Sequence, residues 1–163
     1  MGKASGVTIS LMRKEDIDQV LAIERASFSM PWSRNLFVSE FRSPLVSSLL
    51  VALADGPERT VIGYIVFWCV TDEMHILNLA VVPDLRRQGV ARKLFLAALK
   101  RAGGKGAKRA FLEVRASNTA ARKFYSDLGF TGTAVRRDYY DHPTEDAVVM
   151  TLEEGSFSGL VRG

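Results

Sequence analysis

The most restrictive feature of the sequence is a strand-like apolar run that passes through a basic loop into a helix. Residues 75–82, HILNLAVV, form the run, and a proline follows it. The loop then carries adjacent arginines and Gly89, and residues 89–102 have the apolar spacing of an amphipathic helix. A strand followed directly by a helix is the repeating step of α/β proteins, so this segment favours an α/β fold.

The remaining segments extend this pattern. Apolar periodicity and turn residues predict helices over 14–28, 33–43 and 118–129, and strands over 47–55, 60–70, 109–116, 130–140 and 146–154. This order predicts a single α/β domain with one mixed, mostly antiparallel sheet and helices on both faces. We expect residues 8–154 to form the domain, residues 1–7 a disordered or cloning-derived N-terminus, and residues 155–163 a flexible tail.

Composition restricts the class of protein, its redox compartment and its capacity to bind metal. With 163 residues, 47% of them hydrophobic, the chain suits one globular domain, and no apolar stretch is long enough for a membrane span. The single Cys69 excludes an internal disulfide and is expected to be buried and inert, in a reducing cytoplasm. His75 and His142 have no partners at metal-ligand spacing, so no metal is expected.

The charge pattern favours a small polyanion over nucleic acid. The net charge is +4, but the basic residues are scattered and lack interleaved aromatics. The first amides of the helix that begins near Gly89 are expected to lack intrahelical partners and, with the helix dipole, to attract an anion. Gly89 and Ala91 leave room for a pyrophosphate, which the neighbouring arginines would attract. An ordinary strand–helix turn with surface arginines remains the alternative, and no Walker A or G-x-G-x-x-G motif is present.

The loop also resembles a family signature. Arg86-x-x-Gly89-x-Ala91 is similar to the acyl-CoA signature [Q/R]-x-x-G-x-[G/A] of the GNAT N-acetyltransferases. The similarity extends over residues 8–152 through FSMPWS, NLAVVPDLRRQGVARKL, LEVRASNTAARKFYSDLGF and RRDYY…EDAVVM. These segments resemble the RimI branch, whose members acetylate the N-terminal alanine of the eighteenth small-subunit ribosomal protein.

The resemblance implies a fold, a cosubstrate and a binding surface. The central parallel pair of strands would splay apart, and acetyl-CoA would lie between them. Backbone amides of the first strand of this pair, in the segment LNLAVV, would stabilise the oxyanion of the attacked thioester. The residues implied to contact acetyl-CoA are Leu79, Ala80, Val81, Arg86, Arg87, Gln88, Gly89, Val90, Ala91, Arg92 and Asn118.

Two residues are candidates for proton transfer. Glu113 lies in an apolar strand where burial would raise its pKa toward that of a useful base, and it matches the base position of the RimI-like proteins. A glutamate paired with Arg115 or exposed to water is the alternative. Tyr125 borders the apolar stripe of the helix after Asn118, where a core tyrosine is the default. The resemblance implies that Tyr125 is the acid that protonates the leaving thiolate.

The acceptor side is predicted from aromatic and acidic residues. Trp32, Tyr139 and Tyr140 are candidates for peptide binding, and Glu73 and His75 form a second possible acid–base pair or an ordinary strand end. Acids beside the tyrosines would suit a cationic peptide, although a solvated hairpin remains the alternative. The resemblance implies that the acceptor is a protein N-terminus, that of a ribosomal protein. It also implies that the acetyl group passes directly from acetyl-CoA to the amine. A small amine, a lysine side chain, and a non-catalytic acyl-CoA-binding module are the alternatives.

Overall fold

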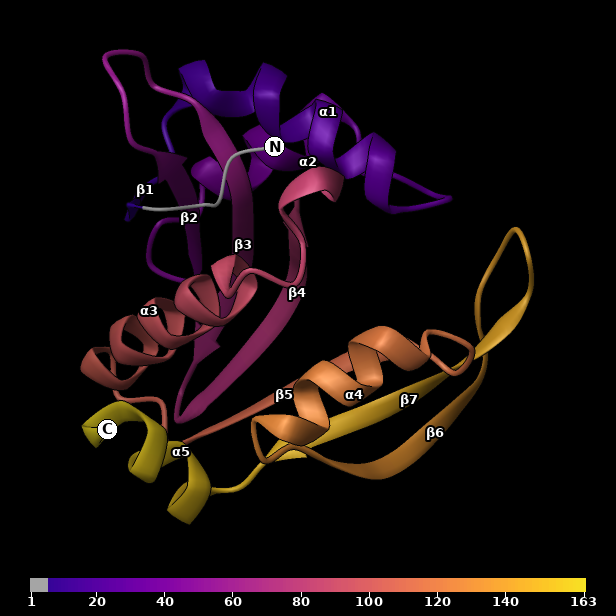
Figure 1. Ribbon diagram of the computed structural model, residues 1–163. Helices are drawn as coiled ribbons and strands as arrows, with labels where there is room; N and C mark the ends of the chain where they lie inside the picture. The colour runs from indigo at the N-terminus through magenta and orange to yellow at the C-terminus, as the bar shows by residue number, and fades with distance from the viewer. Residues whose placement is uncertain (1–5) are drawn as a thin grey trace.

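The computed structural model describes residues 6–163, in which seven strands form one sheet (Figure 1). The strands are β1 (Val7–Leu11), β2 (Ser47–Ala54), β3 (Val61–Val70), β4 (Glu73–Val81), β5 (Arg109–Arg115), β6 (Thr131–Tyr140) and β7 (Glu145–Leu152). Their order is β1-β2-β3-β4-β5-β7-β6, and only β4 and β5 run parallel. The predicted mixed, mostly antiparallel sheet is confirmed.

Helices cover both faces of this sheet, as the sequence predicted. They are α1 (Ile17–Ser27), α2 (Arg34–Phe41), α3 (Val90–Gly104), α4 (Thr119–Asp127) and α5 (Glu154–Arg162). The first two pack on one face and the other three on the opposite face (Figure 1). None of the helices within residues 6–163 is long and apolar enough to cross a membrane.

Strand β3 shows why the two cores need continuous apolar sequence. Tyr64 and Val66 belong to the core beneath α1 and α2, whereas Ile65 and Phe67 belong to the core beneath α3. Alternate side chains of a strand point to opposite faces, so a central strand covered on both faces is apolar throughout. Cys69 is buried near the end of this strand, as predicted, and burial raises the pKa of its thiol.

The sheet opens at its centre, between β4 and β5. The two strands pair only over Glu73–His75 and Arg109–Phe111 and then diverge (Figure 1). Just beyond this pairing, the register between β3 and β4 shifts so that Leu77 has no partner. An extra residue of this kind bends its strand, which accounts for the direction that β4 takes away from β5. The splayed parallel pair implied by the resemblance is present.

The N-terminal boundary differs from the prediction. Residues 1–5 of the expected disordered segment lie outside the described residues. Val7, also assigned to that segment, begins β1 and pairs with Ala54 of β2. The strand was not predicted because it is only five residues long and lies at the edge of the sheet.

The C-terminal segment also differs: the expected flexible tail is wrong. Residues Glu154–Arg162 form α5, and the Phe157 side chain is only 2% exposed, within the core beneath α3. Two glycines and two serines give this segment a low helix propensity, which hid the helix in the sequence. Burial of an apolar face stabilises it instead.

Replacing Phe157 should measure this stabilisation. Phe157→Ala is expected to lower the free energy of unfolding by about 3–5 kcal/mol, because it removes a buried aromatic ring. Urea denaturation monitored by circular dichroism would measure the loss. Ser156→Ala, at an exposed position of the same helix, is the matched control and should have little effect. Equal stability of the two variants would contradict this stabilisation and support the prediction of a flexible tail.

Candidate active site

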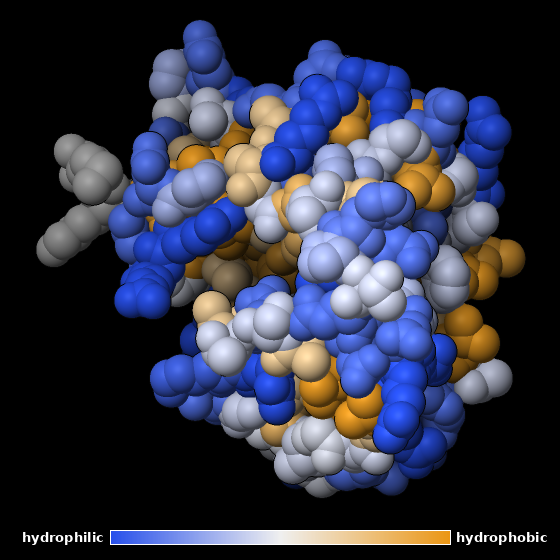
Figure 2. All heavy atoms as spheres, turned by 90° about the vertical axis from the view of Figure 1, so that its right-hand side faces the viewer, coloured by the Kyte–Doolittle hydropathy of each residue, from blue (hydrophilic) through white to orange (hydrophobic). Residues whose placement is uncertain are grey.

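A cavity of about 260 Å³ opens where β4 and β5 separate. Its walls come from α1, the α1–α2 loop, β4, β5, α4 and the last residue of β6. Figure 2 shows a recess with an apolar floor on this side of the molecule. Six of the predicted site residues line the cavity: Trp32, Leu79, Glu113, Asn118, Tyr125 and Tyr140. The cavity is therefore the candidate site for acetyl transfer.

Glu113 lies in β5 with its side chain only 8% exposed. Its Oε2 atom is 2.6 Å from Nε2 of His75, and its Oε1 atom is 3.8 Å from Nη2 of Arg136. Burial by itself would raise the pKa of Glu113, but the hydrogen bond with His75 and the charges of His75 and Arg136 outweigh burial and lower it. The expected raised pKa is wrong, because the sequence did not reveal these partners.

The alternative pairing of Glu113 with Arg115 is not found either. The Arg115 guanidinium instead pairs with Glu145 at 3.4 Å. Glu113 is therefore a carboxylate that stays ionised at neutral pH, reaches the cavity and is held by two basic side chains. Such a group can accept a proton but has only a modest affinity for it.

Of the two alternatives for Glu73 and His75, an acid–base pair or an ordinary strand end, the pair is not formed. The His75 ring stacks on Phe111 at a centroid distance of 4.3 Å and contacts Glu113 across the parallel strands. Glu73 is exposed at the start of β4, in register with Arg109 and outside the cavity lining. His75 is therefore a partner of the candidate base, whereas Glu73 lies apart from both.

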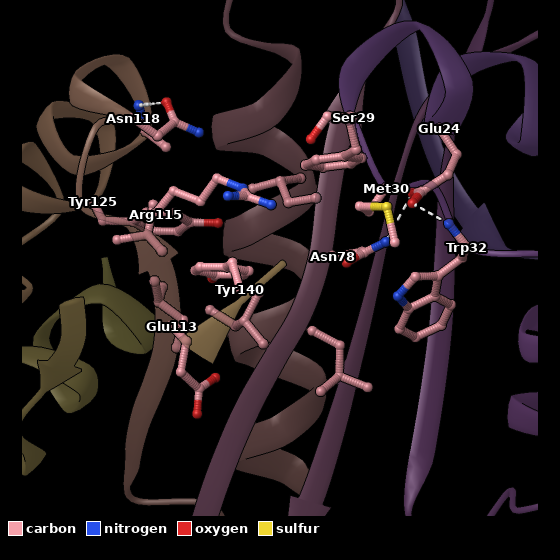
Figure 3. A pocket seen from close by; sticks show the side chains of 17 residues that line it. Glu24, Ser29, Met30, Trp32, Asn78, Glu113, Arg115, Asn118, Tyr125 and Tyr140 are labelled. Atoms are coloured by element: carbon pink, nitrogen blue, oxygen red, sulfur yellow. Dashed lines mark hydrogen bonds between the residues drawn. The ribbon is translucent and has the colours of Figure 1, made fainter. Parts of the chain in front are cut away.

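Tyr125 projects from α4 into the cavity (Figure 3). Its ring packs edge-on against Phe130 at 5.4 Å, the residue is 8% exposed, and burial raises the pKa of its hydroxyl. The hydroxyl makes no hydrogen bond to another residue within 6–163. Every buried side-chain polar atom in that range has a partner, so the hydroxyl oxygen cannot be one of the buried atoms. The hydroxyl therefore faces the cavity, protonated and available to a ligand.

Arg115 contacts Tyr140 in the wall of the cavity and the turn that follows β6. Its guanidinium lies 4.4 Å from the centre of the Tyr140 ring and donates hydrogen bonds to the carbonyls of Asp141 and Pro143, each at 3.0 Å. Burial is the main reason that the pKa of Tyr140 rises to about 12. Tyr139 is 47% exposed, contacts Tyr140 edge-on and does not line the cavity. Of the two predicted tyrosines, only Tyr140 forms a wall.

The basic loop before α3 forms a second cavity, of about 320 Å³. Gly89 precedes the helix with φ +84°, and Arg87 has φ +61°. Apart from Gly89 and its two chain neighbours, no residue has an atom within 4 Å of where a Cβ of Gly89 would be, and no side chain caps the helix. The predicted residues that line this cavity are Val81, Arg86, Arg87, Gly89, Val90, Ala91 and Arg92. Uncapped amides beside basic side chains suit a diphosphate.

Two of the residues implied to contact acetyl-CoA line neither cavity, and Asn118, which lines the first, also has a local structural role. Ala80 is buried in the core beneath α1. Gln88 approaches the Asp84 carbonyl at 3.5 Å and is outside the lining of the second cavity. Asn118 caps α4, as predicted, since its Oδ1 accepts a hydrogen bond from the Ala121 amide at 3.1 Å (Figure 3).

Arg86 has a different role from the other two arginines. Its Nε donates to the Val81 carbonyl at 3.1 Å, and its Nη2 donates to Ser27 Oγ at 2.9 Å. These bonds tie the loop to β4 and to the end of α1. Arg87 and Arg92 are exposed at the cavity and are the better candidates for contact with phosphate.

Comparison with known proteins decides the family. The profile of the acetyltransferase (GNAT) family matches residues 17–130. The chain belongs to the GNAT acetyltransferase family. This GNAT enzyme is an acetyl-CoA-dependent acyltransferase.

Its relatives cover nearly the full length. A Bacillus subtilis (strain 168) protein is 37% identical over 85% of this chain and 90% of its own length, and is named provisionally as a [ribosomal protein bS18]-alanine N-acetyltransferase. The Escherichia coli K12 protein of that name is 34% identical over 89% of this chain and 96% of its own. The crystal structure of the Escherichia coli S18-alanine N-acetyltransferase matches with a TM-score of 0.81 and 32% identity, covering 91% of this chain and 94% of that one.

The geometry of the GNAT enzyme fits acetyl-CoA. The two cavities lie along the same strand, since Leu79 lines the first and Val81 the second. The glycine loop suits the diphosphate, and the gap between β4 and β5 suits the narrow arm that carries the thioester. Bound there, acetyl-CoA would supply an activated acetyl group. No cluster of three or more potential metal ligands occurs within residues 6–163.

Residues that were not predicted also line the first cavity, among them Glu24, Asn78 and Met30. Glu24 stands seven residues after Ile17, in line with the buried Val20 and Leu21 of α1. A carboxylate at an apolar position of a helix stripe is the signal that could have identified it. Asn78, an amide within the apolar run HILNLAVV, carries a similar signal, and Met30 carries none.

Gly89→Ala should test the anion site. An alanine at this left-handed φ costs roughly 1–2 kcal/mol and places a methyl group where the ligand approaches. We expect CoA affinity, measured by isothermal titration calorimetry, to fall by about tenfold or more. Gly104→Ala, at the other end of the same helix with open space around it, is the control and should leave CoA affinity unchanged. Unchanged affinity in Gly89→Ala would contradict the site.

Proposed function

We propose that this GNAT enzyme transfers the acetyl group of acetyl-CoA to the N-terminal α-amino group of a protein, and that its acceptor is the N-terminal alanine of ribosomal protein bS18. The relatives that cover most of the chain carry this activity in their names. The observation that supports it in the site is the ionised Glu113 at the cavity between β4 and β5. A cytoplasmic setting follows from the proposal, because ribosomal proteins are made there.

The lowered pKa of Glu113 favours an α-amine over a lysine. An α-amino group has a pKa of about 7.7–8.0, so roughly one molecule in five to ten is neutral at pH 7. A lysine with a pKa of about 10.4 offers roughly one neutral molecule in a few thousand. A carboxylate whose proton affinity is reduced by His75 and Arg136 suffices for the first acceptor and is poorly suited to the second.

The side chains of the cavity divide the proton transfers between them. Glu113 takes the proton from the attacking amine, directly or through a water, while His75 and Arg136 hold its carboxylate in place. Tyr125 gives a proton from its hydroxyl to the departing thiolate, and a water relays the proton that Glu113 has accepted to the resulting tyrosinate, so that both side chains return to their starting states. Backbone amides around Leu79 and Val81, on the edge of β4 that β5 leaves unpaired, are suited to stabilise the oxyanion. Cys69 lines neither cavity, which supports direct transfer without an acetyl-enzyme.

The peptide enters between the α1–α2 loop and the β6–β7 hairpin. Trp32 and Tyr140 line this end of the cavity, and the exposed Tyr139 packs edge-on against Tyr140. Asp138 and Asp141 are exposed nearby on the hairpin and would attract a basic peptide. Glu73 and His75 are not assigned direct peptide contacts.

Mass spectrometry after incubation with acetyl-CoA tests the proposed function. Two basic peptides that begin with alanine would be compared, one with a free α-amine and one N-terminally blocked but containing lysine. We expect acetylation of the free peptide alone. Acetylation of both peptides would indicate a lysine or broader acceptor. If neither peptide is acetylated while CoA still binds, the proposal fails in favour of a small-amine enzyme or a non-catalytic acyl-CoA-binding module.

A further inference from the structure

A buried carboxylate joins two walls of the first cavity. Glu24, in the third turn of α1, is only 1% exposed. Its Oε2 accepts a hydrogen bond from the Trp32 amide at 2.9 Å, and its Oε1 accepts one from Asn78 Nδ2 at 2.8 Å (Figure 3). The Tyr64 hydroxyl also donates to Oε1. Glu24 thus holds the α1–α2 loop and strand β4 together.

These two attachments have direct consequences for the cavity. The Trp32 amide belongs to the loop whose residues Ser29, Met30 and Trp32 form the acceptor wall. Asn78 lies on β4 just past the bulge at Leu77, where the strand has left β5. Figure 3 shows Glu24 and Asn78 meeting beside Met30, on the side of the cavity opposite Glu113 and Tyr125. One carboxylate therefore connects two segments that line this side of the cavity.

The carboxylate is also unusual in its surroundings. No lysine, arginine or histidine within residues 6–163 forms an ion pair with Glu24, so its charge is balanced only by neutral donors. Burial raises the pKa of its carboxyl group. Burying an unpaired charge is unfavourable, and an apolar residue at this position of the helix would add to the core instead. Stability alone thus does not explain Glu24.

We propose that Glu24 is a positioning residue for the acceptor: by fixing the α1–α2 loop against Asn78 of β4, it holds the cavity in the shape that binds the N-terminal residue of the peptide. This inference rests on the proposed function. Glu24 acts through the loop and through Asn78, and it takes no part in the proton transfers. Its loss should therefore weaken acceptor binding and leave the acetyl-CoA site intact.

Three measurements on Glu24→Gln test the proposal. In steady-state kinetics with the alanine-first peptide, KM for the peptide should rise at least tenfold, while KM for acetyl-CoA stays within twofold. In hydrogen-exchange mass spectrometry of the free enzyme, the amides of residues 28–33 should exchange faster. The thermal midpoint at pH 8 should change little, because the loss of a buried charge offsets the loss of the one hydrogen bond that the glutamine –NH2 cannot accept.

A matched control separates positioning from general loss of structure. Asp16 is also a 1% exposed carboxylate at the start of α1, but it binds Arg59 and does not line the cavity. Asp16→Asn should lower the thermal midpoint and leave both the peptide KM and exchange in residues 28–33 unchanged. Asn78→Ala should raise the peptide KM, and the double variant with Glu24→Gln should be no worse than the more affected single variant.

The outcomes distinguish the inference from the proposed function. Unchanged exchange of residues 28–33 in Glu24→Gln would overturn the inference whatever the acceptor is. An unchanged peptide KM, or equal increases in both KM values with a lower thermal midpoint, would also overturn it. Absence of peptide acetylation by the unmodified enzyme would instead overturn the proposed function, and exchange would still decide the role of Glu24.

Discussion

The separation of β4 from β5 is the constraint on which the rest of the site depends. Three residue pairs hold the strands together, and the bulge at Leu77 then turns β4 away. A fully paired sheet would leave no room at its centre for an extended ligand. Both faces are closed by helices, so the opening leads into a surrounded cavity, with the glycine loop before α3 further along the same strand.

The electrostatics of the opening follow from this geometry. Where the strands are still paired, His75 is brought within 2.6 Å of Glu113, and this contact offsets the effect of burial on the pKa of the carboxylate. A few residues further, Asn78 of β4 is bound by Glu24, which has no cationic partner among the described residues. Two carboxylates on opposite sides of one cavity therefore differ in proton affinity, and we assign them different roles: Glu113 in proton transfer and Glu24 in positioning.

The sequence predicted what depends on local periodicity. The helices and strands from α1 to β7 follow apolar spacing and turn residues, whereas β1 is too short and α5 too rich in glycine and serine to show a pattern. The open sheet was implied only by the family resemblance. The partners of Glu113 depend on the register between β4 and β5 and on the approach of β6, which no local pattern encodes, so the direction of its pKa shift was predicted wrongly. Glu24 was visible as an acid on an apolar stripe, but its link to Asn78 was not.

The most direct test of this account is the single-turnover rate of Glu113→Gln between pH 6 and 9. If Glu113 is the base, transfer to an alanine-first peptide should slow by about 10²–10⁴-fold near pH 6.5, and the defect should shrink above pH 8 as the amine becomes neutral. CoA affinity should be nearly unchanged. Glu40→Gln, a carboxylate bonded to Trp68 outside the cavity lining, should react as the unmodified enzyme does. A Glu113→Gln rate equal to that of the unmodified enzyme at every pH would contradict the account.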